Sequence, residues 1–333
     1  MTGSVHGSVK RTAPVEVVPG TWLIDTLLAD QPRMVGVYAQ ATPDGRVVLI
    51  ETGSGATVEA VRSGLESLGA KPGEIVGIVV THIHLDHAAG AGALSAWSGA
   101  PVYVHPLGRK HLADPSRLWR SAARIYGDAM DRLWGPMEPV PEQLLHPLED
   151  GATIDLGGAR YQVLHTPGHA RHHLSLLDAD GNVFVGDAAG ILLPDVALIR
   201  PALPPPETDL EAAAESCRRI AELQPERLLL THFGAVQQVH DHLQQVVERN
   251  TAWGAEVKAG MDAGEDEATL IRRIERLEDR ELAPLLLPDA ALVPYRASSD
   301  ARMTVMGLSR YWRLRDDAAE APADPSGDGS GES

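Results

Sequence analysis

The chain has 333 residues, of which 44% are hydrophobic and 23% charged, and this balance excludes a chain that is disordered throughout. Its 29 lysines and arginines against 46 aspartates and glutamates give a net charge of −17, which disfavours a nucleic-acid partner because phosphate backbones are repelled. No apolar run reaches the roughly 18–20 residues of a membrane span, and the first twenty residues lack the apolar core of a secretory signal. We therefore expect a cytoplasmic protein that does not bind membranes. The single cysteine, Cys217, excludes an internal disulfide and a zinc site built from several cysteines.

The first part of the chain predicts strands that end in glycine turns or polar loops. Residues 15–52 read as strands with turns, and the last of these strands, 46–50, leads into a glycine-rich turn that begins with Glu51. Apolar residues at helical spacing predict a helix over 56–68. A buried strand is predicted at 75–80, and it continues directly into a loop with three histidines.

The middle of the chain predicts helices inserted between further strands. Residues 107–145 combine aromatic, charged and leucine residues in a helical pattern. Further strands are predicted at 102–104, 159–164, 174–177, 183–185 and 227–230. A helix is predicted over 209–223, where Asp209 can cap the first turn. Residues 235–315 predict a helical extension, and 316–333 predict a disordered acidic tail.

Histidines and aspartates gather where the predicted strands end. The densest group is His82-x-His84-x-Asp86-His87, directly after the strand at 75–80. Imidazole nitrogens and carboxylate oxygens are the ligands of hydrolytic metals, and an extended loop that turns into a helix can direct them to two sides. That arrangement suits two ions better than one.

Three more residues of these types follow later strands. His169 lies in the turn Thr166-Pro167-Gly168 after one strand, Asp187 follows another, and His232 follows the last. Strand ends are rigid supports, and the turns after them allow distant side chains to converge. The repetition of one arrangement four times predicts a metal site rather than a solvated polar loop.

In the order and spacing of these motifs, the chain resembles the metallo-β-lactamase superfamily over about residues 15–234. The resemblance implies an α/β fold, the αββα metallo-β-lactamase sandwich, with a catalytic domain at 15–234. The residue pattern adds a helical insertion at 107–145 and a helical C-terminal extension at 235–315. It also implies a site at one edge of the two sheets. The set of five histidines and two aspartates is similar to that of glyoxalase II and lactonase-type members.

The resemblance further implies the role of each ligand. His82, His84 and His169 would hold one divalent cation, and Asp86, His87 and His232 a second, with Asp187 between them. A hydroxide that bridges the two metals would attack an ester, thioester or lactone, and Asp86 would also accept a proton. The imidazole-rich set suits zinc, with iron or manganese as alternatives. The expected partner is a small-molecule substrate, and an apolar stretch at 302–312 makes a homodimer a reasonable hypothesis.

Two residues beside the ligands receive supporting roles. Glu51 stands where the family has an aspartate, and it either accepts the N–H of a ligand histidine or stabilises its own turn. His173 matches the last histidine of a T-P-G-H-x-x-G-H pattern, although His172 replaces its glycine, and we expect His173 to support ligands rather than to bind metal. Lactonases of the superfamily carry a tyrosine where this chain has Gly190, which weakens that assignment.

Other activities and roles stay open from the sequence. A mononuclear iron enzyme similar to persulfide dioxygenases would keep most of these ligands, and a phosphodiesterase would use two metals but suits an acidic surface less well. The aromatic residues of the insertion form either an apolar lid over the metals or ordinary packing against the sandwich. These residues, with one methionine among them, are Trp119, Tyr126, Met130 and Trp134.

Overall fold

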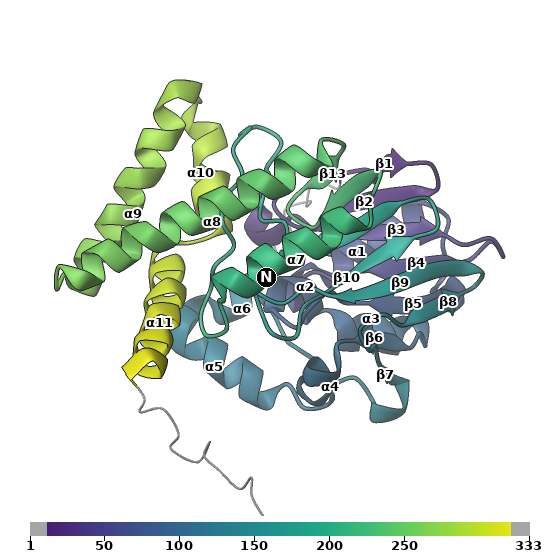
Figure 1. The fold of residues 1–333 in the computed structure, drawn as a ribbon. Coiled ribbons are helices and arrows are strands. Elements are labelled where there is room, and N and C mark those ends of the chain that lie inside the picture. Colours follow the sequence, from purple (N-terminus) through teal and green to yellow (C-terminus); the bar gives the residue numbers. More distant parts are fainter. Residues whose placement is uncertain (1–11, 321–333) are drawn as a thin grey trace, which may run out of the picture.

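In the computed structural model of the protein, which describes residues 12–320, two β-sheets lie face to face and helices cover both outer faces (Figure 1). The first sheet has seven strands in chain order: β1 (Val15–Val18), β2 (Thr21–Asp25), β3 (Gly36–Ala41), β4 (Val47–Ile50), β5 (Ile75–Val79), β6 (Val102–Val104) and β7 (Leu145–Pro147). The second sheet has six strands: β13 (Gly234–Val236), β12 (Arg227–Leu230), β11 (Asn182–Gly186), β10 (Leu174–Asp178), β9 (Ala159–His165) and β8 (Thr153–Leu156). The predicted αββα sandwich is confirmed.

Both sheets are mixed. In the first, the strands are antiparallel from β1 to β4 and parallel from β4 to β7. In the second, only β11 and β12 are parallel neighbours. Parallel neighbours need a crossover connection, which the helices on the outer faces provide. The ends of β5, β9, β11 and β12 carry the loops that were predicted to hold a metal.

The central strands are apolar on both faces because each face packs against another layer. In β4, Val48 and Ile50 pack between the two sheets, whereas Leu49 packs toward the helices. In β12, Leu229 packs between the sheets and Leu228 faces the helices on the other side. Each fully buried side chain of this kind contributes about 1.5–3 kcal/mol relative to an exposed one. The core therefore forms three apolar layers around two sheets.

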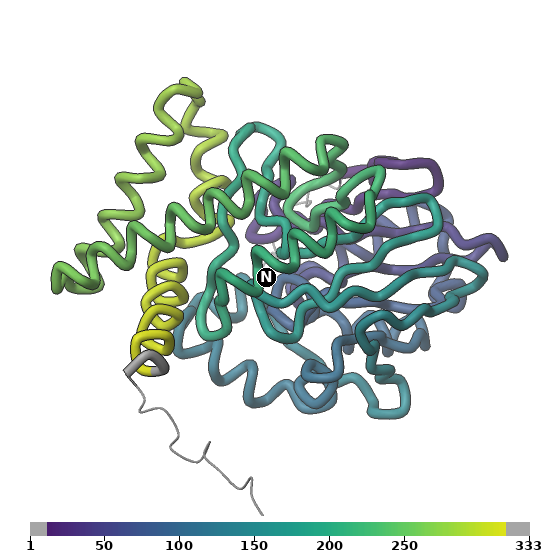
Figure 2. The backbone as a smooth tube through the Cα atoms, in the orientation of Figure 1, coloured from purple at the N-terminus to yellow at the C-terminus, as the bar shows by residue number. Residues whose placement is uncertain are grey.

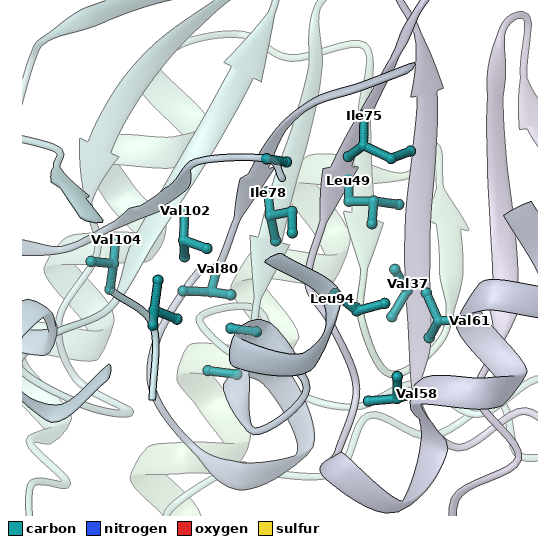
Figure 3. Packing of buried hydrophobic residues seen from close by; sticks show 14 of the residues in the cluster. Val37, Leu49, Val58, Val61, Ile75, Ile78, Val80, Leu94, Val102 and Val104 are labelled. Carbon is teal, nitrogen blue, oxygen red and sulfur yellow. The ribbon is translucent and has the colours of Figure 1, made fainter. Parts of the chain in front are cut away.

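The helices α1 (Val58–Ser67) and α3 (Ala91–Ser98) cover the first sheet, and α7 (Leu210–Glu222) and α8 (Val239–Asp262) cover the second. Side chains of the first pair meet those of the central strands in Figure 3, where the labelled residues include Val58, Val61, Leu94, Val37, Leu49 and Ile78. The predicted cap of α7 is confirmed, since the Asp209 side chain accepts a hydrogen bond from the backbone N–H of Ala212. A Cβ at Gly64 would lie 2.6 Å from Ile24 Cγ2, so glycine permits the close contact between α1 and the sheet.

Between β6 and β7 the chain forms α4 (Pro106–Ala113), α5 (Ser116–Tyr126) and α6 (Met130–Leu133). The aromatic residues of this segment pack in one cluster with Leu85, which lies inside the histidine-rich loop. Trp134 is only 8% exposed, and Tyr126 packs edge-on against it with ring centroids 5.0 Å apart. These contacts place the aromatic residues against the sandwich, beside the histidine-rich loop.

The C-terminal helices are α9 (Glu267–Leu282), α10 (Asp289–Ser298) and α11 (Ala301–Glu320), and in Figure 2 the green-to-yellow tube of this region lies at one end of the sandwich. They pack on α8 and on the segment 191–202, which follows Asp187.

Two boundaries differ from the sequence prediction. The strand β13 precedes α8 within the region expected to be helical, because it completes the edge of the second sheet. Helix α11 reaches Glu320, five residues into the expected tail, and 321–333 lie outside the described residues. Within the described chain, the helices are all too short or too polar to cross a lipid bilayer.

Candidate metal centre

The histidine-rich loop begins just after β5 and ends in the short helix α2 (Leu85–Ala88). His84 has an extended backbone, with φ −65° and ψ 156°, so the side chains of His82 and His84 can lie on one side of the loop. Asp86 and His87 belong to the first turn of α2 and face a different direction. This change from extended chain to helix divides the motif into two groups of ligand atoms.

The first group consists of His82, His84 and His169. The Nδ1 atom of His84 lies 3.0 Å from His82 Nε2 and 2.7 Å from His169 Nε2. His169 comes from the turn after β9, which is 85 residues further along the chain than His84. Three imidazole nitrogens therefore converge on one point, and they belong to the three histidines that the resemblance assigns to one cation.

The second group consists of Asp86, His87 and His232. The Nε2 atoms of His87 and His232 lie 3.3 Å apart, and Asp86 Oδ2 lies 3.6 Å from the first and 3.5 Å from the second. His232 is supplied by the end of β12. The carboxylate of Asp86 is 22% exposed, whereas His87 is fully buried, so Asp86 marks the accessible side of this group.

Asp187 lies between the two groups and contacts both. Its Oδ2 lies 3.3 Å from His169 Nε2, and its Oδ1 lies 3.3 Å from the Nε2 atoms of both His87 and His232. Oδ1 is buried and has no hydrogen bond of normal geometry to any described residue. One carboxylate thus directs one oxygen to each group, and the structure brings all seven predicted ligands together.

The outward-facing nitrogens fix the protonation of four of these histidines. His169 Nδ1 lies 2.9 Å from the carbonyl of Ala202, and His232 Nδ1 lies 2.6 Å from the carbonyl of Met34. His87 Nδ1 lies 3.0 Å from Glu51 Oε1. Since carbonyl and carboxylate oxygens only accept, each of these nitrogens carries the hydrogen.

His82 also carries its hydrogen on the outward-facing Nδ1, because the hydroxyl of Thr81 accepts a hydrogen bond from it. The hydroxyl of Thr81 donates to Glu51 Oε1 over 2.5 Å, so its oxygen accepts from His82 Nδ1 over 3.0 Å. In their neutral form, these four imidazoles therefore present an unprotonated Nε2 to the centre. Lone pairs that face one another at about 3 Å repel unless a proton or a cation lies between them.

The pKa values show how the two groups differ. Burial, followed by the neighbouring imidazoles, lowers the pKa of His82 and His84 well below the usual value, so the first group is neutral. In the second group burial also lowers the pKa of His232, but the carboxylates of Asp187 and Asp86 together outweigh it and raise the pKa to about 10. A proton is therefore held in the second group at neutral pH.

The donor set fits a pair of divalent cations. Two imidazole-rich groups, one terminal carboxylate and one carboxylate with an unpartnered buried oxygen match the ligand types that zinc and related metals take. Asp86 and Asp187 bring two negative charges, and two divalent cations would leave the site net positive. Such a site favours a substrate atom that gains negative charge during the reaction.

The hydrogen bonds of Glu51 favour a role in orienting candidate ligands over a role as a ligand. It is fully buried with φ 72°, and His82 and His87 lie close enough to form a third candidate group with it. However, Oε1 already accepts hydrogen bonds from His87 Nδ1, from Thr81 and, over 3.1 Å, from the hydroxyl of Thr231. Of its two open roles, the structure shows contact with a ligand histidine.

His173 also lies behind the site. Its Nε2 accepts the backbone N–H of Asp187 over 3.1 Å, and its Nδ1 faces the hydroxyl of Thr166 at 2.8 Å. This arrangement holds the turn that carries Asp187 and leaves no ring nitrogen for a metal. The contacts agree with the supporting role expected from the sequence.

The sequence interpretation missed several of the groups that orient the ligands. Thr81 and Thr231 each precede a ligand histidine, and the repeated Thr-His pair at two strand ends was the signal that could have identified them. The carbonyls of Met34 and Ala202 left no such signal, because every residue has one. Only the tertiary contacts reveal which carbonyls act.

Comparisons with known proteins agree with this geometry. The sequence model of the Metallo-beta-lactamase superfamily matches residues 32–232. A metallo-beta-lactamase fold-containing protein of Sulfurisphaera tokodaii is 30% identical over 201 residues, which are 59% of this chain and 74% of that protein. Its crystal structure superposes with a TM-score of 0.60 and 28% identity, covering 70% of this chain and 86% of the other.

Two further similarities extend the comparison. The crystal structure of a metallo-beta-lactamase family protein from Thermus thermophilus matches 92% of this chain and 97% of its own at a TM-score of 0.60, and its 22% identity supports the fold alone. The hydroxyacylglutathione hydrolase of Vibrio cholerae is 31% identical over 110 residues, which are 33% of this chain and 31% of that enzyme. This last similarity is therefore distant and partial.

Proposed function

Since the chain belongs to the metallo-β-lactamase superfamily and directs two groups of ligand atoms at the two oxygens of Asp187, we propose that it is a hydrolase that uses two divalent cations. His82, His84 and His169 would hold one cation, and Asp86, His87 and His232 the other. Such a pair activates water near neutral pH and polarises a carbonyl oxygen of the substrate. The observation that carries the proposal is the placement of Asp187 between the groups, with one oxygen toward each.

The protein residues would hold the site and move one proton. Glu51, Met34 and Ala202 keep ring hydrogens on the outer nitrogens, so the inner nitrogens stay available for binding. Asp86 would accept the proton of the attacking water at Oδ2, because its carboxylate is the more accessible of the two in the site.

Among substrates, we propose a thioester or another activated ester ahead of a lactone. The partial similarity to a hydroxyacylglutathione hydrolase supports the thioester class. A lactonase-type tyrosine has no place at Gly190, where φ is 68° and a Cβ would lie 3.0 Å from the carbonyl oxygen of Arg200. The net charge of −17 makes a phosphodiester the less favoured substrate.

Metal analysis and a substrate panel on one preparation test the proposal. We expect two divalent cations per chain and hydrolysis of aryl or acyl thioesters that stops when a chelator removes them. One iron per chain with sulfur-dependent oxygen uptake would refute the hydrolase and favour a mononuclear oxygenase. Faster turnover of bis-aryl phosphates than of thioesters would refute the substrate class while leaving the cation pair intact.

A further inference from the structure

His84 differs from the other four histidines of the metal centre in how it is held. Each of the other four has an acceptor for its outward-facing nitrogen. Within residues 12–320, no hydrogen bond to His84 Nε2 is found, although its Nδ1 is the atom at which the first group converges. A ligand ring without an outer hydrogen bond needs another contact to fix its orientation.

His172 provides such a contact. Its ring meets the ring of His84 edge-on, with centroids 5.6 Å apart and an angle of 87° between the planes. It also lies parallel to the ring of His82, at 6.2 Å and 14°. The His172 side chain is 12% exposed, so it fills the space beside both ligands. The glycine of the pattern noted in the sequence has no side chain with which to make these contacts.

His172 is itself tied to the loop and to a carboxylate. The backbone N–H of Ile83, between the two ligands, donates to His172 Nδ1 over 3.5 Å. On the other side, His172 Nε2 lies 3.5 Å from Glu207 Oε2. Glu207 is in turn held by the backbone N–H and the Nε of Arg171, at 3.1 and 3.2 Å. The distances to His172 are long, so each contact is weak, but together they fix both ends of the ring.

We propose that His172 is a positioning residue for the first cation. It packs against His84 and holds the peptide of Ile83, so that His82 Nε2 and His84 Nδ1 point to one position. The inference rests on the cation-binding part of the proposed function and does not depend on the substrate. It predicts that His172 affects affinity for the cation without being a ligand.

Cobalt(II) is the probe for the test, because its visible absorption reports the geometry of the ligands. Purified full-length protein, freed of metal, is titrated with cobalt(II) in competition with a chelator. We expect His172→Ala to weaken binding of one of the two equivalents about tenfold, the one held by His82, His84 and His169, and to change its visible spectrum. His172→Asn, whose amide oxygen can replace Nδ1 as the acceptor for Ile83, should recover most of the affinity. The control His240→Ala changes an exposed histidine of α8 and should bind as the wild type does.

Glu207→Gln provides a second variant in case His172→Ala does not fold. It weakens the anchor of His172 without opening a cavity and should reduce the affinity about threefold. Wild-type affinity and spectrum in His172→Ala would overturn the inference, as would His172→Asn binding as weakly as the alanine variant. If the wild type itself binds no divalent cation, the proposed function fails and the inference fails with it. If the wild type and His172→Ala both bind two cations with equal affinity, the inference about His172 is wrong and the proposed function still stands.

Discussion

Glutamine in place of Glu51 tests how strongly a buried carboxylate controls the metal centre without touching the metal. Glu51 is fully buried and accepts four hydrogen bonds. Three of them, from Thr81, Thr231 and His87, reach Oε1, and the fourth, from the backbone N–H of Thr81, reaches Oε2 over 3.2 Å. A glutamine has one acceptor oxygen in place of two. If that oxygen takes the position of Oε1 and accepts from the three donors there, the amide NH₂ group takes the position of Oε2 and faces the backbone N–H of Thr81.

The magnitude follows from that mismatch. Two donors that face each other in a buried position cost about 1–3 kcal/mol, which we expect as the loss in unfolding free energy of the cation-free protein. The substitution also removes the negative charge opposite His87 Nδ1, which makes Nε2 a weaker ligand. Changes of this kind typically weaken metal binding about 10–100-fold, or roughly 1.4–2.7 kcal/mol.

Two assays check the prediction on the same protein. Chemical denaturation of the cation-free form gives the unfolding free energy, and zinc titration against a competing chelator gives the affinity. Glu59→Gln, which changes an exposed glutamate of α1, is the matched control and should leave both quantities unchanged. If Glu51→Gln binds zinc as tightly as the wild type, Glu51 only stabilises its own turn and the reasoning from His87 is wrong.

Three further predictions concern the ligands themselves. Asp187→Ala should lose metal and hydrolysis together, since it removes a carboxylate that lies between the groups and faces each with one oxygen; retention of both in metal analysis and turnover assays would contradict this role. His173→Ala should weaken metal binding less than His169→Ala, because His173 contacts the Asp187 backbone and not the centre; equal losses in zinc titration would contradict the assignment. Binding of a cation at the second group should release a proton near pH 7, because the raised pKa values of His87 and His232 keep a proton there that the cation displaces. Calorimetry in two buffers of different ionisation enthalpy should show the release as a difference in binding heat, and equal heats would argue against it.

The helical segments show what pattern alone leaves open about packing. The spacing in residues 107–145 predicts helices, and α4 to α6 form there. Whether their aromatic side chains cover the metals or pack on the sandwich depends on contacts with Leu85 and with the segment around Met34, which are distant along the chain. Similarly, the short strand β13 is only three residues long, and it forms because β12 offers an unpaired edge.

For the metal centre, the sequence alone determined the types of ligand and their supports. Imidazoles and carboxylates directly after apolar strands are local features, since strand formation and the turn that follows depend on neighbouring residues. His82, His84, His169, Asp187 and His232 could therefore be chosen, and the structure places them together.

Only the tertiary structure decided how those ligands are held. Which oxygen of Asp187 faces which group, and which carbonyl receives the ring hydrogen of His169 or His232, depend on segments that meet in space. Backbone carbonyls are chemically the same at every residue, so no residue type marks those of Met34 and Ala202 in advance. The place of His172 beside His84 is likewise set by the packing of two loops 88 residues apart in the chain, as the numbering shows. Local chemistry selected the candidate ligands, and long-range packing fixed their orientation.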